Sequence, residues 1–185
     1  MRFLLAVLLF GSTVVHATTI EFESGTMSEF NELYQEQGFA FSGSLAMSTG
    51  APSPRTDAIA LLWQPGTVLT MERVGGGAFA LNSFDYNAQL GPAVETNLLT
   101  VTGYLAGGGQ IQTVLSGLAG SWLTPTFDSS WSNLLRVEIV DDQNAQPYLT
   151  GIEQLQASAV PIPAAVWLFG SALAGLGWMR RKQTV

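Results

Sequence analysis

The residues of this chain that could do chemistry are its carboxylates. All 14 Asp and Glu side chains lie between residues 18 and 159, where only Arg55, Arg73 and Arg136 oppose them. The net charge of that segment is therefore 3 − 14 = −11, against −7 for the whole chain. A surface this acidic repels phosphate backbones, so we expect no nucleic-acid partner. It attracts cations or keeps the protein soluble, and both explanations stay open.

The residue types that are missing exclude most catalytic mechanisms. Residues 18–159 contain no His, Cys or Lys, because the single histidine is His16 and the single lysine is Lys182. Ser-His-Asp and Cys-His catalysis, Schiff bases and histidine-ligated metals therefore have no candidates, and no disulfide can form. Two carboxylates alone can hydrolyse glycosides. No spacing selects such a pair, so we expect the protein not to be an enzyme.

Aromatic side chains are the candidates for ligand contact. Tryptophan and tyrosine combine a large apolar ring with a polar edge, and such rings can stack on the apolar faces of sugars. Trp122 and Tyr148 lie beside loop-like segments, and Trp63 ends an apolar run. We take these three as possible glycan contacts. The alternative, that they are core aromatics, stays open.

Alternating and β-branched runs, bounded by Gly, Pro, Asn, Asp and Ser, predict an all-β domain. We expect ten strands: Thr19–Glu23, Phe39–Ser42, Ala58–Trp63, Val68–Arg73, Phe79–Tyr86, Leu98–Leu105, Ile111–Leu115, Leu123–Phe127, Leu134–Val140 and Leu149–Ala157. The spacing of apolar residues in Met27–Gln35 predicts one short helix. Ten strands at this spacing indicate two facing antiparallel sheets, as in a jelly roll.

Two glycine clusters mark turns. Gly75–Gly77 and Gly107–Gly109 are each followed by strand-like sequence, not by a helix that could hold a phosphate. We therefore expect both to be hairpin turns, in which glycine supplies the positive φ.

The N-terminus has the pattern of a secretory signal peptide. Arg2 precedes an apolar run from Phe3 to Phe10, and small residues continue to Ala17. This order of a basic start, an apolar stretch and a small-residue cleavage site predicts export. We expect cleavage between Ala17 and Thr18, which makes residues 1–17 the signal peptide.

The C-terminus carries a second apolar segment. Val160-Pro161-Ile162-Pro163 precedes 16 uncharged residues, Ala164–Met179, and the cations Arg180, Arg181 and Lys182 follow. As a helix, those 16 residues would span about 24 Å, and the residues before them extend this toward the bilayer core thickness. We expect a single transmembrane helix whose basic end stays cytoplasmic.

This tail resembles the VPLPA-type variant of the PEP-CTERM sorting signal. The resemblance rests on Val160, Pro161, Pro163 and Ala164, the apolar run, and the basic Arg180, Arg181 and Lys182, with Ile162 between the prolines. It implies a Gram-negative envelope, a membrane protease of the exosortase class that cuts near the prolines, and an association with exopolysaccharide and biofilm matrix. The alternative is an ordinary anchor that is never cut.

Residues 18–159 resemble the β-sandwich ectodomains that often carry this signal, which are similar to carbohydrate-binding jelly rolls. The resemblance rests on Glu21-Phe22-Glu23, Gln37–Phe41, Phe79–Phe84 and Phe127–Leu134. It implies a structural calcium between the first and last strands. The candidate ligands are Glu21, Glu23, Asp141, Asp142 and Glu153. With Phe22 in the core, alternation places Glu21 and Glu23 outward, where they form a rim site or are two solvated carboxylates.

We therefore expect three regions: the signal peptide 1–17, a β-sandwich ectodomain 18–159, and the sorting signal 160–185. The leading functional expectation is a non-catalytic exported protein, anchored at first in the inner membrane, that binds or organises exopolysaccharide. One alternative is a structural or adhesive surface protein that associates with itself through sheet edges. A carboxylate-dependent glycosidase is the third.

Overall fold

A computed structural model of the chain describes residues 17–23, 31–48, 59–64, 66–87, 96–118, 121–141 and 150–160, together with Leu173. The chain divides into two units, His16–Val160 and the two ends Met1–Val15 and Pro161–Val185, and of the second unit only Leu173 is described. The expected signal peptide up to residue 16 and the expected transmembrane helix, apart from Leu173, thus lie outside the described residues. Within the described part, no helix is both long enough and apolar enough to cross a membrane.

The unit His16–Val160 is built of β-strands, as the alternating sequence predicts. The strands are β1 (Ala17–Ile20), β2 (Asn31–Glu36), β3 (Phe39–Ser48), β4 (Ala60–Trp63), β5 (Val68–Arg73), β6 (Phe79–Asn87), β7 (Thr96–Leu105), β8 (Gln110–Leu118), β9 (Leu134–Asp141) and β10 (Thr150–Ala159). One 3-10 helix, η1 (Ser129–Trp131), precedes β9. Every strand pair among the described residues is antiparallel. The all-β prediction is confirmed.

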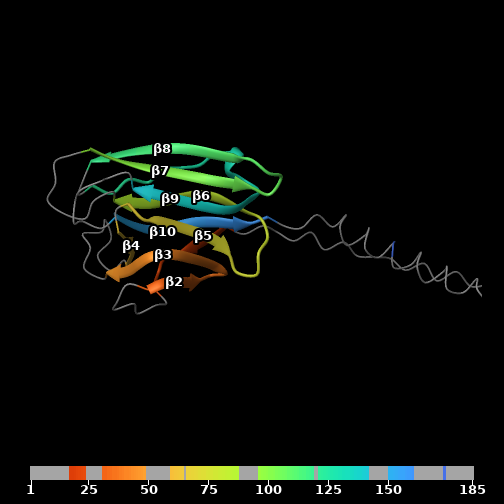
Figure 1. Ribbon diagram of the computed structural model, residues 1–185, viewed down its shortest axis with the longest axis horizontal. Helices are drawn as coiled ribbons and strands as arrows, with labels where there is room; N and C mark the ends of the chain where they lie inside the picture. The colour runs from red at the N-terminus through yellow and green to blue at the C-terminus, as the bar shows by residue number, and fades with distance from the viewer. Residues whose placement is uncertain are drawn as a thin grey trace, which may run out of the picture. The chain divides into compact units, whose positions relative to one another are not determined.

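Two layers of strands face each other across one core (Figure 1). The first layer, called here the front sheet, has the order β2-β3-β5-β9-β7-β8. In the rear layer, β10 pairs with β6 on one side and with β1 and β4 on the other. Because β4 also pairs with β3, the layers are joined on that side. Phe39 of β3 meets Phe79 of β6 edge to face, with ring centroids 5.4 Å apart, which closes the core between the layers.

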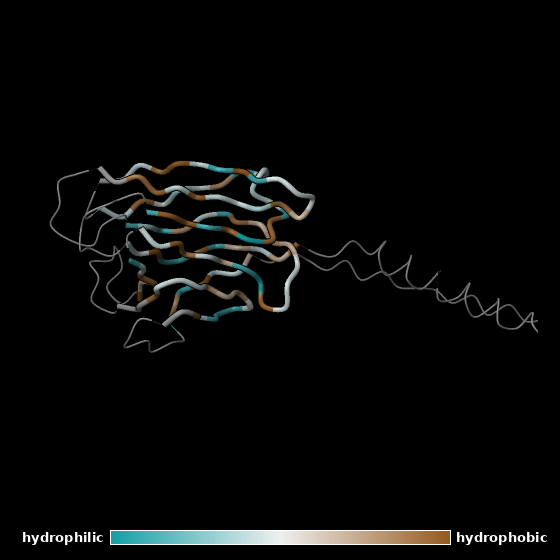
Figure 2. The backbone as a smooth tube through the Cα atoms, in the orientation of Figure 1, coloured by the Kyte–Doolittle hydropathy of each residue, from teal (hydrophilic) through white to brown (hydrophobic). Residues whose placement is uncertain are grey.

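Side chains alternate along the front sheet between the core and the solvent, and Figure 2 shows the matching alternation of hydropathy. In β5, Leu69 and Met71 are buried while Val68 and Glu72 are exposed. Phe22, which follows β1, is fully buried, and Glu21 and Glu23 are exposed, as the alternation predicts. Burial of about 25 cal/mol per Å² of apolar surface makes this core the main stabilising element, in the absence of disulfides.

The helix predicted over Met27–Gln35 is wrong where the structure describes it, because Asn31–Glu36 form strand β2. Tyr34 is buried against Phe22 and Phe41, whereas Leu33 is exposed, which is the period of a strand. Gln37 and Gly38 both have positive φ, 49° and 80°, so they form the tight turn that joins β2 to β3. A short apolar spacing is a weak helix signal, and this hairpin overrides it.

Two further predictions need correction. The strand expected over Leu123–Phe127 is reduced to isolated bridges of Leu123 with Tyr86 and of Thr126 with Ser83, because Pro125 between them has no N–H to donate. Gly75–Gly77 turn the chain, but the flanking strands β5 and β6 do not pair with each other, so this turn is not a hairpin.

The other glycine cluster behaves as predicted. Gly107–Gly109 connect β7 to β8, which pair along their full lengths. The Gly108 N–H donates to the Leu105 carbonyl at 3.0 Å, and Gly108 and Gly109 both have φ of 87°. Glycine adopts this conformation without the steric cost that a side chain brings.

Candidate functional site

The outward side of the front sheet carries a lattice of polar side chains, called here the polar sheet face. It consists of Thr70, Glu72, Thr102, Tyr104, Gln110, Gln112, Arg136 and Glu138. The strand registers arrange them in two rows across β5, β9, β7 and β8. One row runs Glu72, Arg136, Tyr104, Gln110, and the other runs Thr70, Glu138, Thr102, Gln112.

Three side chains at the centre of this face hold one another in place. The Tyr104 hydroxyl donates to Glu138 Oε2 at 2.6 Å. The Arg136 guanidinium lies over the Tyr104 ring, 4.1 Å from its centroid, in a cation–π contact. Arg136 Nε also lies 3.2 Å from Glu138 Oε1, as an ion pair without hydrogen-bond geometry. Each side chain is thus fixed by the other two, so little conformational freedom remains to be lost when a ligand binds.

The exposure of these groups suits them to contact a ligand. The side chains of Arg136 and Glu138 are 39% and 26% exposed, so both are anchored and both reach the solvent. Beside them, Gln112 Nε2 donates to Thr102 Oγ1 at 3.1 Å. The face therefore offers guanidinium and amide donors, a carboxylate acceptor, and hydroxyl groups that can both donate and accept hydrogen bonds. One side of the Tyr104 ring is occupied by Arg136, so hydrogen bonding is the main mode of contact that this face offers.

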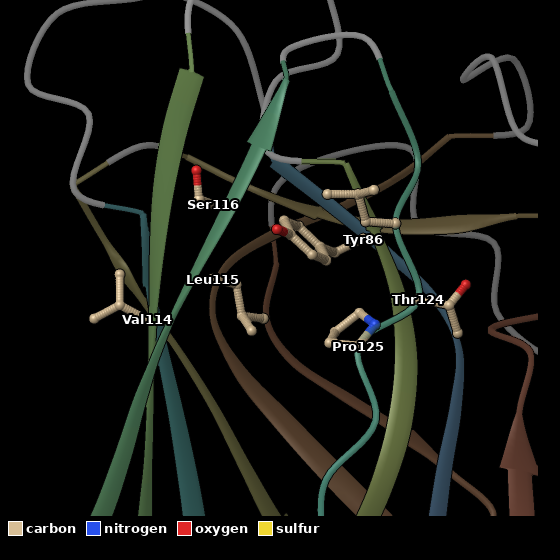
Figure 3. Close-up of a pocket in the computed structure, with 7 residues that line it drawn as sticks. Tyr86, Val114, Leu115, Ser116, Thr124 and Pro125 are labelled. Carbon is tan, nitrogen blue, oxygen red and sulfur yellow. The ribbon is translucent and has the colours of Figure 1, made fainter.

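A separate pocket lies at the edge of the sandwich, between β8 and residues 121–127 (Figure 3). Its volume is about 330 Å³, and it is called here the edge pocket. The residues that line it are Tyr86, Val114, Leu115, Ser116, Leu123, Thr124 and Pro125.

Hydrogen bonds fix the wall of the edge pocket that lies opposite β8. Tyr86 and Leu123 exchange backbone N–H···O bonds of 2.9 Å in both directions, and the Thr124 hydroxyl donates to Asp85 Oδ1 at 2.5 Å. Tyr86 itself is 2% exposed, and burial raises the pKa of its phenol. Its hydroxyl is therefore neutral at physiological pH and can both donate and accept.

The structure places the three aromatic candidates in different environments. Trp63 is fully buried in β4, so it cannot contact a glycan, and that prediction is corrected. All four residues of β4 are buried, so this strand is enclosed by protein on both faces. Trp122 is half-buried and precedes Leu123 of the edge pocket. Tyr148 lies outside the described residues.

Four of the five acidic candidates for a calcium site, Glu21, Glu23, Asp141 and Glu153, lie among the described residues. Glu21 and Glu23 are exposed beyond β1, while Asp141 is buried and accepts a hydrogen bond from the Thr150 hydroxyl. Glu153 is buried in β10, opposite Asp85 of β6. Among the described residues, no three His, Cys, Asp or Glu side chains are grouped closely enough to hold a metal ion. Asp142 lies outside those residues, and calcium binding stays a prediction.

Most of the sorting motif is beyond the described part of the chain. Val160 is described, and its N–H donates to the Ala78 carbonyl at 3.0 Å just after β10. Pro161, Pro163, Ala164, Arg180, Arg181 and Lys182 lie outside the described residues. At the predicted signal-peptide cleavage site, Ala17 and Thr18 both belong to β1, where they pair with Ser158 and Ala157.

The sequence pattern did not predict Arg136 and Glu138 as site residues. Their alternation with the buried Val137 and Ile139 could have placed them on the solvent side of a strand. The register that sets Tyr104 opposite Arg136 could not have been predicted in this way. It joins strands about 30 residues apart in the sequence, and no local pattern encodes it.

No protein-family model and no curated protein matches this chain. Among solved structures, it is similar to TmCBM61 in complex with beta-1,4-galactotriose, with 13% identity over 71% of this chain and 91% of that chain and a TM-score of 0.45. The family 11 carbohydrate-binding module from Clostridium thermocellum, in complex with a beta-1,3-1,4-mixed-linked tetrasaccharide, shares 10% identity with this chain. The match covers 79% of this chain and 96% of that module, with a TM-score of 0.37. The agarase AgWH50C shares 9% identity with this chain, and the match covers 78% of this chain and 25% of the agarase with a TM-score of 0.45. All these TM-scores lie below 0.5.

Proposed function

We propose that this protein is an exported, non-catalytic module that binds a polysaccharide on its polar sheet face. The observation that carries the proposal is the mutually fixed group of Tyr104, Arg136 and Glu138, flanked by Thr102 and Gln112. Sugar hydroxyls both donate and accept hydrogen bonds, and this face supplies partners of both kinds. Groups that are already held in place bind with a smaller loss of conformational entropy.

The size and charge of the face favour a neutral chain polymer. Neighbouring strands are about 4.8 Å apart, so four strands present polar groups over roughly 14 Å, the scale of a short oligosaccharide. The charge of −11 between residues 18 and 159 (3 − 14) disfavours an acidic polymer. A neutral exopolysaccharide fits both observations.

Retention of the protein on immobilised neutral polysaccharides tests this proposal. Glu138→Gln removes the charge that Arg136 and Tyr104 share, and we expect it to abolish retention. Glu36→Gln is a matched control, because Glu36 accepts from the Tyr34 hydroxyl at 2.7 Å in the same type of Tyr–Glu pair but lies on β2, outside the polar sheet face. Equal retention of wild-type protein and Glu138→Gln would refute binding at this face.

The absence of catalysis has its own test. We expect no reducing sugar to be released from a polysaccharide that retains the protein. Release that disappears in Glu138→Gln or Glu72→Gln would show that the face hydrolyses its ligand, because glycosidases use pairs of carboxylates.

We further propose that the chain is exported by its N-terminal signal and processed by an exosortase-type protease at the C-terminal signal. The order of Pro161, Pro163, the apolar run and the basic cluster supports this. In a host that has such a protease, replacing Pro161 and Pro163 by Ala should leave an uncut precursor in the inner membrane. Fractionation and the mass of the mature protein measure this outcome. A wild-type chain that stays full-length in the membrane would indicate plain anchoring.

Self-association is the second candidate function, and strand β8 favours it. The strand Gln110–Leu118 contains no charged residue. Within the described part of the chain it pairs with β7 alone, and Val114 is 54% exposed. An uncharged edge strand can add a strand from another copy.

A further inference from the structure

The edge pocket is lined by Tyr86, whose ring is buried in the core and whose hydroxyl is available to a ligand. The Tyr86 hydroxyl points toward β8 in Figure 3, and it makes no hydrogen bond to the described residues. Glycine at position 117 leaves room in front of it, since a Cβ there would lie 3.1 Å from this hydroxyl and 3.2 Å from Leu123 Cδ1. This hydroxyl lines the edge pocket and can donate or accept a hydrogen bond, so a ligand in the pocket has a polar group to bind.

The other lining residues define the chemistry of a ligand. Val114, Leu115, Leu123 and Pro125 form apolar walls, and the hydroxyls of Ser116 and Thr124 lie among them. None of the seven lining side chains is charged. The pocket therefore suits an uncharged molecule with an apolar face and hydroxyl groups at its rim. Its volume of about 330 Å³ lies at the lower end of the range for small-molecule sites.

The position of the pocket relates it to the polar sheet face. Gln112, Val114 and Ser116 share the outward side of β8, which is the last strand of the front sheet. A polysaccharide that crosses the polar sheet face from β5 toward β8 would reach the edge pocket at the end of the sheet. Val114 and Ser116 follow Gln112 along the outward side of β8 and also line the edge pocket, and Leu115, which points inward, lines the pocket as well.

We propose that the edge pocket binds the terminal ring, a neutral pyranose, of the polysaccharide that lies on the polar sheet face. The Tyr86 hydroxyl bonds a ring hydroxyl, and the aliphatic walls contact the apolar side of the ring. The inference rests on the proposed function, but it concerns a different set of residues and fails separately.

The test compares two substitutions that each remove one phenolic oxygen. Binding of methyl pyranosides of glucose, galactose, mannose and xylose is measured by saturation-transfer NMR, with retention on polysaccharide in parallel. We expect at least one methyl pyranoside to bind, with about five-fold weaker affinity in Tyr86→Phe, the scale of one hydrogen bond. Tyr104→Phe should leave this affinity unchanged and reduce retention on the polysaccharide.

A second variant guards against a folding artefact. Ser116 is exposed on β8, so Ser116→Phe fills the pocket rim without disturbing the core, and it should also abolish methyl pyranoside binding. The inference is overturned if no methyl pyranoside binds, or if both pocket variants bind it like wild type. If wild-type protein is not retained on any polysaccharide, the proposed function fails instead.

Discussion

The Tyr104 hydroxyl donates a 2.6 Å hydrogen bond to Glu138 Oε2, across two neighbouring strands and 34 residues of sequence. The Arg136 guanidinium covers the same tyrosine ring and forms an ion pair with the same carboxylate. Three polar side chains are thereby organised on a solvent-facing sheet, where isolated surface ion pairs contribute little to stability. The proposed function assigns this arrangement to ligand contact.

The first prediction separates a role of Arg136 in ligand binding from a role in folding stability. Arg136→Lys removes the planar group that stacks on Tyr104 while keeping the charge. We expect the free energy of unfolding to fall by less than about 1 kcal/mol, because the pair is partly exposed. Retention on polysaccharide should fall by much more. Denaturant unfolding and glycan retention measure the two effects.

Arg73→Lys is the control for that substitution, since Arg73 ends β5 beyond the rows of the polar sheet face. Arg73→Lys should change neither the free energy of unfolding nor the retention on polysaccharide. A loss of stability in Arg136→Lys that fully accounts for the lost retention would contradict a binding role.

A second prediction concerns the close packing around Gly103 of β7. A Cβ there would lie 2.7 Å from Leu134 Cδ2 and 3.1 Å from both Ile111 Cγ2 and Trp131 Cζ3. Gly103→Ala should therefore destabilise the fold by about 1–3 kcal/mol through overpacking. Gly107→Ala is the control, because nothing lies within 4 Å of a Cβ at that position. Melting temperatures that fall equally in both variants would contradict this packing.

The third prediction concerns acid stability at Asp128, which caps η1. The side-chain hydroxyl of Ser130 and then its backbone N–H donate to this carboxylate and hold its pKa below the ordinary value of 3.8. A lowered pKa in the folded state gives stability that is present above the unfolded value and is lost as pH falls through the folded one. We expect this loss to begin near pH 4 and to continue below it.

Asp128→Asn should remove that part of the pH dependence while leaving the amide able to cap the helix. Melting curves of both proteins between pH 7 and 2 measure the difference. Identical acid profiles would show that the Ser130 hydrogen bonds do not favour the ionised form in solution.

The fourth prediction concerns Tyr86 at high pH. Burial raises the pKa of its phenol, so the folded state keeps this proton when the unfolded state has lost it. Its contribution to stability is therefore present below about pH 10 and is lost as pH rises through the folded-state pKa. Ultraviolet titration should show a late-titrating component that is absent in Tyr86→Phe. A difference spectrum that titrates at the ordinary tyrosine pKa would contradict this.

The last prediction tests the uncharged edge of β8. Val114→Lys places a charge on the exposed side of this strand and should prevent edge-to-edge pairing. If the protein associates through β8, sedimentation should show oligomers of the wild type at high concentration and a monomer for the variant. Thr70→Lys on β5, which has partners on both sides, is the control. Oligomers that persist in Val114→Lys would exclude this edge.

The sequence alone determined the features that depend on composition and on local pattern. The lack of His, Cys and Lys between residues 18 and 159 excludes several kinds of chemistry in any fold. Alternation predicted most strands correctly and placed Phe22 in the core with Glu21 and Glu23 outside. Gly107–Gly109 marked a hairpin because a tight turn needs a φ that glycine adopts at low cost.

Tertiary structure decided which strands lie side by side and in what register. It turned Asn31–Glu36 into a strand by packing Tyr34 against Phe22, and it buried Trp63, which had been a candidate for ligand contact. It also set Tyr104 opposite Arg136 and beside Glu138. A strand's own pattern specifies which side chains share a face, but its partner is chosen by packing over the whole core. Both candidate surfaces arise from that choice.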